Sequence, residues 1–227
     1  MEQKWPSHIV IVRHGESERN VAKEIAKSKG EHSFGSGLRD MDTPLTEKGK
    51  SDAAATGQHL AKAYKFDAVI TSPYRRTVQT AEQILVQMAA KLRLVQEERI
   101  REIEFGILDG LTPEGTKAKF PEESKRRDRE GKYWYRPPAG ESRPDVALRV
   151  HSFLDTLIRD YRGKSVLVVC HSVVVLIFRR LLERWGEEEF IKIDAEEDVL
   201  NCSVTAYHYD RKLNKLRLEF YNKIFYK

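Results

Sequence analysis

Three short apolar runs, each rich in β-branched residues and each followed by polar side chains, constrain the fold of this chain most. They are residues 8–12 (HIVIV), 67–71 (DAVIT) and 165–170 (SVLVVC). Continuous apolar runs of this length are typical of strands covered on both faces, as in a parallel sheet. Segments with apolar residues at helical spacing separate them. The pattern predicts an α/β fold, a three-layer sandwich whose mostly parallel central sheet is flanked by helices.

The remaining elements follow from periodicity and capping residues. We expect helices at 18–27, 47–64, 73–91, 142–162 and 172–185, a weak strand at 94–96, and a terminal strand pair at 203–209 and 215–221. Between residues 112 and 138 the composition shifts to charged and aromatic side chains, which predicts an inserted cap. The whole chain, 1–227, is expected to form a single domain.

Composition narrows the class of protein further. No stretch of eighteen apolar residues occurs, and the opening MEQKWPSH lacks the basic start and apolar run of a signal peptide, so we expect a cytoplasmic protein without a membrane partner. The two cysteines, Cys170 and Cys202, lie in apolar segments and predict free, buried thiols. A net charge of +5 is modest, and only residues 125–129 form a basic cluster, so no nucleic-acid partner is expected.

Polar residues at the ends of the three strongest strands carry the chemistry. The first strand leads into Arg13 and His14, the second leads to Arg76 through Ser72, and the third ends at His171. In such sheets, ligands bind outside the carboxyl ends of the strands. If the strands are neighbours, imidazoles and guanidiniums converge there and form an anion site that contains a nucleophile.

This set of side chains suits phosphoryl transfer. Guanidinium groups match the geometry of phosphate and stabilise the charge on its oxygens, so neither a metal nor a cofactor is required. A neutral imidazole can attack phosphorus and later release the phosphoryl group to water. The leaving oxygen still needs a proton, which a carboxyl group in the pocket would supply.

A series of ordered motifs strengthens this interpretation, and through them the sequence resembles the histidine phosphatase superfamily, also called the phosphoglycerate mutase-like family. The motifs are RHGES at 13–17 with Asn20, DTPLTEKG at 42–49, TSPYRRTVQTA at 71–81, EIEFG at 102–106, GES at 140–142 and VVCH at 168–171. The resemblance covers almost the whole chain.

The resemblance implies a role for each matched residue. His14 would carry the phosphoryl group, and Glu102 would donate and accept the proton, although Glu104 two residues later competes for that role. Arg13, Asn20, Arg76 and His171 would bind phosphate. His171 is also counted among the catalytic residues.

The sequence departs from the family pattern in two places. Ser172 and Val173 follow the second histidine, where glycine is usual, and they would narrow the pocket. Arg19 stands where glycolytic mutases place tryptophan, which weakens the mutase interpretation.

The cap supplies three further candidates. Arg126, Arg127 and Arg136 would contact the substrate beyond its phosphate if the cap lies over the strand ends. A solvated, charged helix explains them equally well, and the sequence does not choose.

The function expected from the sequence is that of a phosphomonoesterase, a hydrolase acting through phosphohistidine on a small-molecule phosphate ester. A phosphoglycerate mutase-type isomerase uses the same residues and is the alternative. A non-catalytic phosphate-binding scaffold is the third hypothesis, and a nucleic-acid binder is the fourth. The sequence identifies neither the natural substrate nor whether the chain forms a homo-oligomer.

Overall fold

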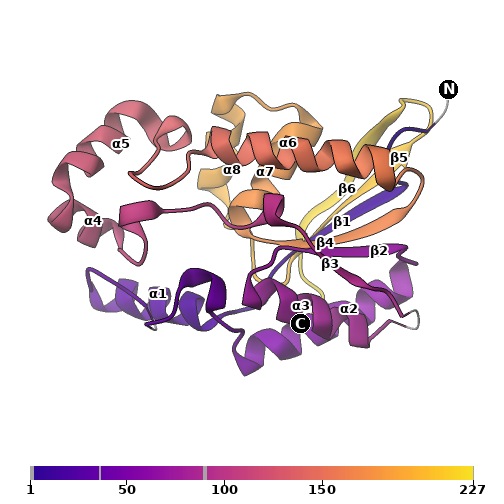
Figure 1. Ribbon diagram of the computed structural model, residues 1–227, viewed down its shortest axis with the longest axis horizontal. Helices are drawn as coiled ribbons and strands as arrows, with labels where there is room; N and C mark the ends of the chain where they lie inside the picture. The colour runs from indigo at the N-terminus through magenta and orange to yellow at the C-terminus, as the bar shows by residue number, and fades with distance from the viewer. Residues whose placement is uncertain (1–2, 36, 89–90, 227) are drawn as a thin grey trace.

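The computed structural model describes residues 3–35, 37–88 and 91–226 and is built around a central sheet (Figure 1). The strands are β1 (His8–Arg13), β2 (Ala68–Thr71), β3 (Leu94–Gln96), β4 (Ser165–Cys170), β5 (Val204–Asp210) and β6 (Lys215–Lys223). Their order across the sheet is β3-β2-β4-β1-β5-β6. The first four strands of that order run parallel, and β5 and β6 are antiparallel to their neighbours. The prediction of a mostly parallel sheet is confirmed.

Helices cover both faces of the sheet (Figure 1). They are α1 (Glu18–Lys29), α2 (Glu47–Ala63), α3 (Arg75–Val86), α4 (Pro113–Lys119), α5 (Pro121–Trp134), α6 (Arg143–Asp160), α7 (Ser172–Glu183) and α8 (Glu187–Glu196), with 3₁₀ turns at Asp40–Asp42, Glu98–Ile100 and Gly106–Leu108. α6 and α7 lie on one face, and α2 and α3 lie on the other. This arrangement is the three-layer sandwich expected from the alternation of strands and helices.

Strand β1 shows how the two layers of core are built. Its side chains alternate between the faces of the sheet because successive residues of a strand point in opposite directions. Ile9 and Ile11 join the core cluster under α6 and α7, whereas Val10 and Val12 join the cluster under α2 and α3. All four side chains are fully buried. The apolar run is therefore continuous because both of its faces are covered.

Strand β4 lies between β1 and β2, and this order brings together the polar residues that follow the three strands. In the register of the sheet Arg13 pairs with Cys170, and Thr71 pairs with Val169. The carboxyl ends of three neighbouring parallel strands therefore lie at nearly the same level. The polar residues that follow them emerge at one edge of the sheet.

The segment expected to form a cap holds α4 and α5. These helices lie beyond the edge of the sheet where the parallel strands end, and α1 lies opposite them (Figure 1). We refer to α4 and α5 as the cap helices. The division into one domain with an inserted cap stays a prediction.

Several details differ from the sequence prediction. α3 ends at Val86 instead of continuing to Lys91, and positions 89–90 lie outside the described residues. Helix α8 was not predicted. Cys170 and Cys202 are both buried and free, as expected. Within the described part of the chain, none of the helices combines the length and the apolar character needed to cross a membrane. The cytoplasmic location stays a prediction.

Candidate active site

His14 follows β1 directly, and its two neighbours fix the tautomer of its ring. Nδ1 lies 2.7 Å from the carbonyl oxygen of Gly15, and Nε2 lies 3.2 Å from Nε of Arg76. A carbonyl only accepts and a guanidinium only donates, so Nδ1 carries the proton and Nε2 holds the lone pair. Burial, followed by the charges of Arg76 and Arg13, holds the pKa of His14 well below its usual 6.5. The buried imidazole is therefore neutral, with the lone pair of Nε2 facing a guanidinium.

The loop that carries His14 depends on close backbone contacts. A Cβ atom on Gly15 would lie 2.6 Å from the carbonyl oxygen of Gly49, and one on Gly49 would lie 2.1 Å from that of Glu16. The backbone N–H of Gly15 donates to Oγ1 of Thr80 at 3.0 Å. Three of the sequence motifs thus contact one another around His14. The glycines are required because the first turn of α2 packs directly against the loop.

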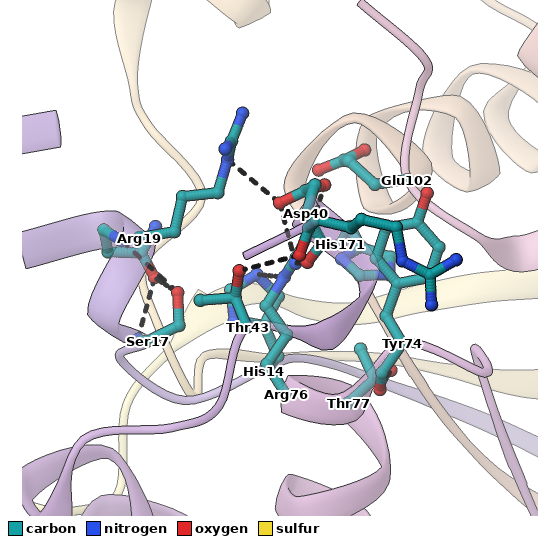
Figure 2. A network of polar contacts seen from close by, with 12 residues as sticks. His14, Ser17, Arg19, Asp40, Thr43, Tyr74, Arg76, Thr77, Glu102 and His171 are labelled. Carbon is teal, nitrogen blue, oxygen red and sulfur yellow. Dashed lines mark hydrogen bonds and ion pairs between the residues drawn. The ribbon is translucent and has the colours of Figure 1, made fainter. Parts of the chain in front are cut away.

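Arg76 lies in the first turn of α3 with its side chain buried, whereas the neighbouring Arg75 is exposed. The two terminal nitrogens of Arg76 face the carboxylate of Asp40, with NH1–Oδ1 at 3.0 Å and NH2–Oδ2 at 3.1 Å. Asp40 also receives an ion pair from Nε of Arg19 at 2.9 Å. Figure 2 shows Asp40 between Arg19 and Arg76, with His14 close by. The carboxylate of Asp40 thus accepts from the guanidinium N–H groups of Arg76, whose geometry matches a phosphate group.

His171 is the N-cap residue of α7 and lies beside His14. The centroids of its ring and that of His14 are 5.3 Å apart. Nε2 is 2.8 Å from Oγ of Ser72, and Nδ1 is buried without a hydrogen-bond partner among the described residues. Burial, followed by the charges of Arg76 and His14, holds the pKa of His171 well below 6.5. A second neutral imidazole therefore faces the site.

Glu102 and Glu104 lie in different surroundings. Glu102 lines the pocket, is 8% exposed, and accepts a hydrogen bond from the N–H of Ile103 at 3.0 Å. Burial raises the pKa of Glu102 above its usual 4.5. Glu104 is exposed and accepts a hydrogen bond from Oη of Tyr74 at 3.0 Å, outside the lining of the pocket. The geometry therefore places Glu102 where a carboxyl group can keep a proton beside a ligand.

Arg13 and Asn20 also line the pocket. Arg13 donates to the carbonyl of Val199, and its Nε is buried without a partner among the described residues. Asn20 is the third residue of α1, and its Oδ1 accepts from the N–H of Ser17 at 3.0 Å in a capping box. The Nδ2 group is therefore the part of the Asn20 side chain that can donate to an anion.

Of the three cap arginines, the structure brings only Arg127 into the pocket lining. Arg126 pairs with Glu130 on the next turn of its own helix, at 2.8 Å. Arg136 donates through Nε to Asp145 of α6, at 2.7 Å. Direct contact of Arg126 and Arg136 with a substrate stays a prediction that these pairings do not favour.

A pocket of about 300 Å³ joins the buried residues to the cap helices. The sequence model of the histidine phosphatase superfamily (branch 1) matches residues 9–222. The chain belongs to this superfamily. Among the residues that the structure describes, no group of three or more histidine, cysteine or acidic side chains is arranged to hold a metal ion.

Some similar proteins within the superfamily are named as mutases and others as phosphatases. A 2,3-bisphosphoglycerate-dependent phosphoglycerate mutase of Bartonella bacilliformis is 33% identical over 81% of this chain and 84% of its own. Phosphoserine phosphatase 1 of Hydrogenobacter thermophilus is 33% identical over 73% and 71%. A solved structure of a mycobacterial glucosyl-3-phosphoglycerate phosphatase has 25% identity and a TM-score of 0.73, covering 95% of this chain and 99% of that one. The superfamily thus includes both phosphatases and mutases among proteins similar to this chain.

Sequence reasoning assigned no role to four residues that the structure brings to this histidine phosphatase site. They are Asp40, Ser72, Arg143 and Asn201. Ser72 was recognisable in principle because it follows a strand end within a quoted motif. Asn201, whose Nδ2 donates to the carbonyl of His14 at 3.0 Å, gave no sequence signal. The two residues that depart from the family pattern after His171, Ser172 and Val173, both line the pocket.

Proposed function

We propose that this chain is a phosphomonoesterase that forms a phosphohistidine at His14 and acts on a small phosphorylated metabolite. The observation that carries the proposal is that the lone pair of His14 Nε2 and the buried carboxyl group of Glu102 lie in the same pocket. His14 is neutral with its Nε2 lone pair beside Arg76, and the pKa of Glu102 is raised by burial. The first step needs a nitrogen with a free lone pair and a carboxyl group that can give a proton, and a raised pKa favours that second role for Glu102.

In the first step, Nε2 of His14 attacks phosphorus, the P–N bond forms, and the P–O bond to the alcohol breaks. Glu102 gives its proton to the departing oxygen, which leaves as a neutral alcohol. Nδ1 keeps its proton, and the carbonyl of Gly15 at 2.7 Å stabilises the charge that develops on the ring. Arg76 binds the phosphoryl oxygens once they replace the carboxylate of Asp40.

In the second step, water attacks the phosphohistidine. Glu102, now a carboxylate, takes the proton of the water, the P–N bond breaks, and inorganic phosphate forms. His14 and Glu102 return to their starting protonation states. Each group is used twice, so no other proton donor is required.

A mutase is the second candidate, and the names of the similar relatives favour it. It would use the same first step but would return the phosphoryl group to a second hydroxyl instead of to water. The replacement of tryptophan by Arg19, which pairs with Asp40, argues for the phosphatase.

The test is a screen of phosphate esters with a free-phosphate readout, in the presence of EDTA. Phosphoglycerates are included with and without a bisphosphate primer, and product analysis separates phosphate release from isomerisation. We expect phosphate release at the same rate with and without EDTA, and an acid-labile phosphoprotein that the His14→Ala variant does not form. Primer-dependent isomerisation without phosphate release would establish the mutase. Phosphate binding without either reaction would indicate a scaffold.

A further inference from the structure

Residues 198–202, between α8 and β5, form a loop that contacts two residues of the candidate active site. The carbonyl of Val199 accepts a hydrogen bond from the guanidinium of Arg13. Nδ2 of Asn201 donates to the carbonyl of His14 at 3.0 Å. We refer to residues 198–202 as the support loop. A shift of this loop would therefore move the partners of both site residues.

The support loop supplies contacts that Arg13 and His14 do not find elsewhere. In the described part of the chain, the carbonyl of Val199 is the hydrogen-bond acceptor of the Arg13 side chain, and Nε of Arg13 has none. The carbonyl of His14 also accepts from the N–H of Cys202 at 3.2 Å. The N–H of His14 donates to the carbonyl of Cys170 at 3.0 Å. His14 is thus held between β4 on one side and the support loop on the other.

The support loop precedes β5 and belongs to neither a helix nor a strand, and Asn222 of β6 fixes its backbone. Oδ1 of Asn222 accepts from the N–H of Leu200 at 2.8 Å, and Nδ2 donates to the carbonyl of Asp198 at 3.0 Å. An N–H only donates and a carbonyl only accepts, so the amide has one orientation. The side chain of Asn222 is 7% exposed. One buried amide thus holds the residues on both sides of Val199, whose carbonyl contacts Arg13.

A β-bulge directs Asn222 toward the support loop. The register between β5 and β6 shifts beside Asn222, where two residues of β6 lie opposite the single residue Thr205. Asn222 has a φ of 54°, in the left-handed region that asparagine adopts more readily than most residues. Bulges of this kind re-aim a side chain and are frequent beside active sites. The local backbone of β6 therefore serves the contact that the amide makes.

We propose that Asn222 is a positioning residue that fixes the support loop and, through it, the guanidinium of Arg13 and the backbone of His14. The proposal rests on the proposed function, in which Arg13 binds phosphate and His14 attacks it. Without the two hydrogen bonds of Asn222, residues 198–200 are free to shift, and the carbonyl of Val199 shifts with them. Arg13 then loses its acceptor, and the pocket binds phosphate less tightly.

The experiment compares Asn222→Gly with the matched control Asn214→Gly. Asn214 lies in the turn between β5 and β6, has a φ of 52°, and accepts from Oη of Tyr209 at 2.6 Å. Each substitution therefore places glycine at a left-handed position of the same strand pair and removes a hydrogen-bonded amide. Three quantities are measured: kcat/KM for p-nitrophenyl phosphate, the dissociation constant of inorganic phosphate by calorimetry, and the midpoint of thermal unfolding.

We expect Asn222→Gly to lower kcat/KM by about tenfold and to weaken phosphate binding by about three- to tenfold, the range for one or two lost hydrogen bonds. Asn214→Gly should match the wild type in both quantities, although both variants should unfold at a lower temperature. Asn222→Asp keeps the acceptor for Leu200 and loses the donor for Asp198, so its losses should be intermediate. This variant also provides the test if the glycine variant does not fold.

A double-mutant cycle in kcat/KM connects Asn222 to the support loop. Asn201→Ala removes the side chain with which the loop contacts His14. Because both substitutions act through the same loop, the loss in the double variant should be smaller than the product of the two single losses. Losses that multiply would mean that Asn222 acts independently of the loop, and they would overturn the proposal.

Two further outcomes would overturn the positioning role. One is a folded Asn222→Gly variant with the kcat/KM and phosphate affinity of the wild type, and the other is an equal loss in Asn214→Gly. Phosphate binding separates these results from a failure of the proposed function. If the wild type binds phosphate but turns over no ester, weaker binding by Asn222→Gly would uphold the role of Asn222 and reject the phosphatase. A wild type that does not bind phosphate would overturn both.

Discussion

The phosphate end of the pocket, around His14, Arg76 and His171, and its cap end, around Arg127 and Arg143, are both cationic but differ in how their charges are paired. At the phosphate end an internal carboxylate satisfies the guanidinium of Arg76. At the cap end the guanidiniums have no partner among the described residues. A phosphate that binds Arg76 would therefore have to displace a carboxylate, whereas Nε of Arg143 is buried without a hydrogen-bond partner among the described residues.

The largest effect tests whether the phosphate end is catalytic at all. Replacing His14 with alanine removes the attacking nitrogen and leaves β1 intact, so we expect turnover to fall by at least about four orders of magnitude. Phosphate release and far-ultraviolet circular dichroism are measured on the same preparation. Activity at the level of the wild type in a natively folded variant would exclude His14 as the nucleophile.

The next effect separates the buried carboxyl from its exposed neighbour. Glu102→Gln should slow hydrolysis of alkyl phosphates by roughly two to four orders of magnitude, because a poor leaving group needs the proton. Hydrolysis of p-nitrophenyl phosphate should suffer less, since its leaving group is already stable as an anion. Rates for both esters are compared at one pH.

Glu104→Gln is the matched control for this substitution. Its carboxylate is exposed and accepts from Tyr74, so both rates should stay nearly unchanged. A reversed pattern would assign the acid to Glu104. An equal loss for both esters in Glu102→Gln would mean that the residue positions His14 and that another group donates the proton.

A smaller effect tests the internal anion. Asp40→Asn removes the charge that occupies Arg76 and repels an incoming phosphate dianion, so inorganic phosphate should inhibit the variant at about three- to tenfold lower concentration. Asp42→Asn is the control because Asp42 pairs with Arg39, outside the pocket lining. Weaker inhibition of Asp40→Asn would show that Asp40 holds Arg76 in place for phosphate instead of competing with it.

The contrast between the two ends also explains what the sequence could predict. His14, Arg76 and His171 follow strands directly or after one turn, so the apolar runs and the rule for parallel sheets are enough to bring them together. Asp40 could not be found in this way, because residues 30–44 lack periodicity and its partner is 36 positions away. Arg143 gave no signal either, since its surroundings arise from the packing of α6 against the segment around Glu102.

The same distinction between local and tertiary information applies to the limits of the helices and strands. The limits of β3 and β4 follow from short local runs and agree with the prediction. The end of α3 does not agree with the prediction. Apolar residues continue the helical spacing beyond Val86, although the chain leaves the helix there. Helix α8 begins with three consecutive glutamates, and its one buried residue, Phe190, gains its place only through packing against the main core.

The raised pKa of Glu102 predicts a moderate effect on stability. The folded state keeps this proton to higher pH than the unfolded state, so the stability that the carboxyl contributes is complete below its usual pKa of 4.5 and is lost as pH rises through the folded value. Glu102→Gln, which cannot ionise, should therefore be more stable than the wild type at pH 8, by on the order of 1 kcal/mol. At pH 4 the difference should be smaller. Urea unfolding at both values is the measurement, and a difference independent of pH would contradict a neutral buried carboxyl.

The smallest expected effect concerns the two cap arginines outside the pocket. Arg126 and Arg136 pair with carboxylates of α5 and α6, and the side chain of Arg136 is 60% exposed. Exposed ion pairs contribute little, so Arg126→Ala and Arg136→Ala should each change kcat/KM by less than about twofold. Arg127→Met, measured with the same ester, provides the comparison from inside the pocket. A loss of tenfold or more in either alanine variant would mean that the cap helices move onto the bound substrate. The cap end would then include Arg126 or Arg136, which pair here with Glu130 and Asp145.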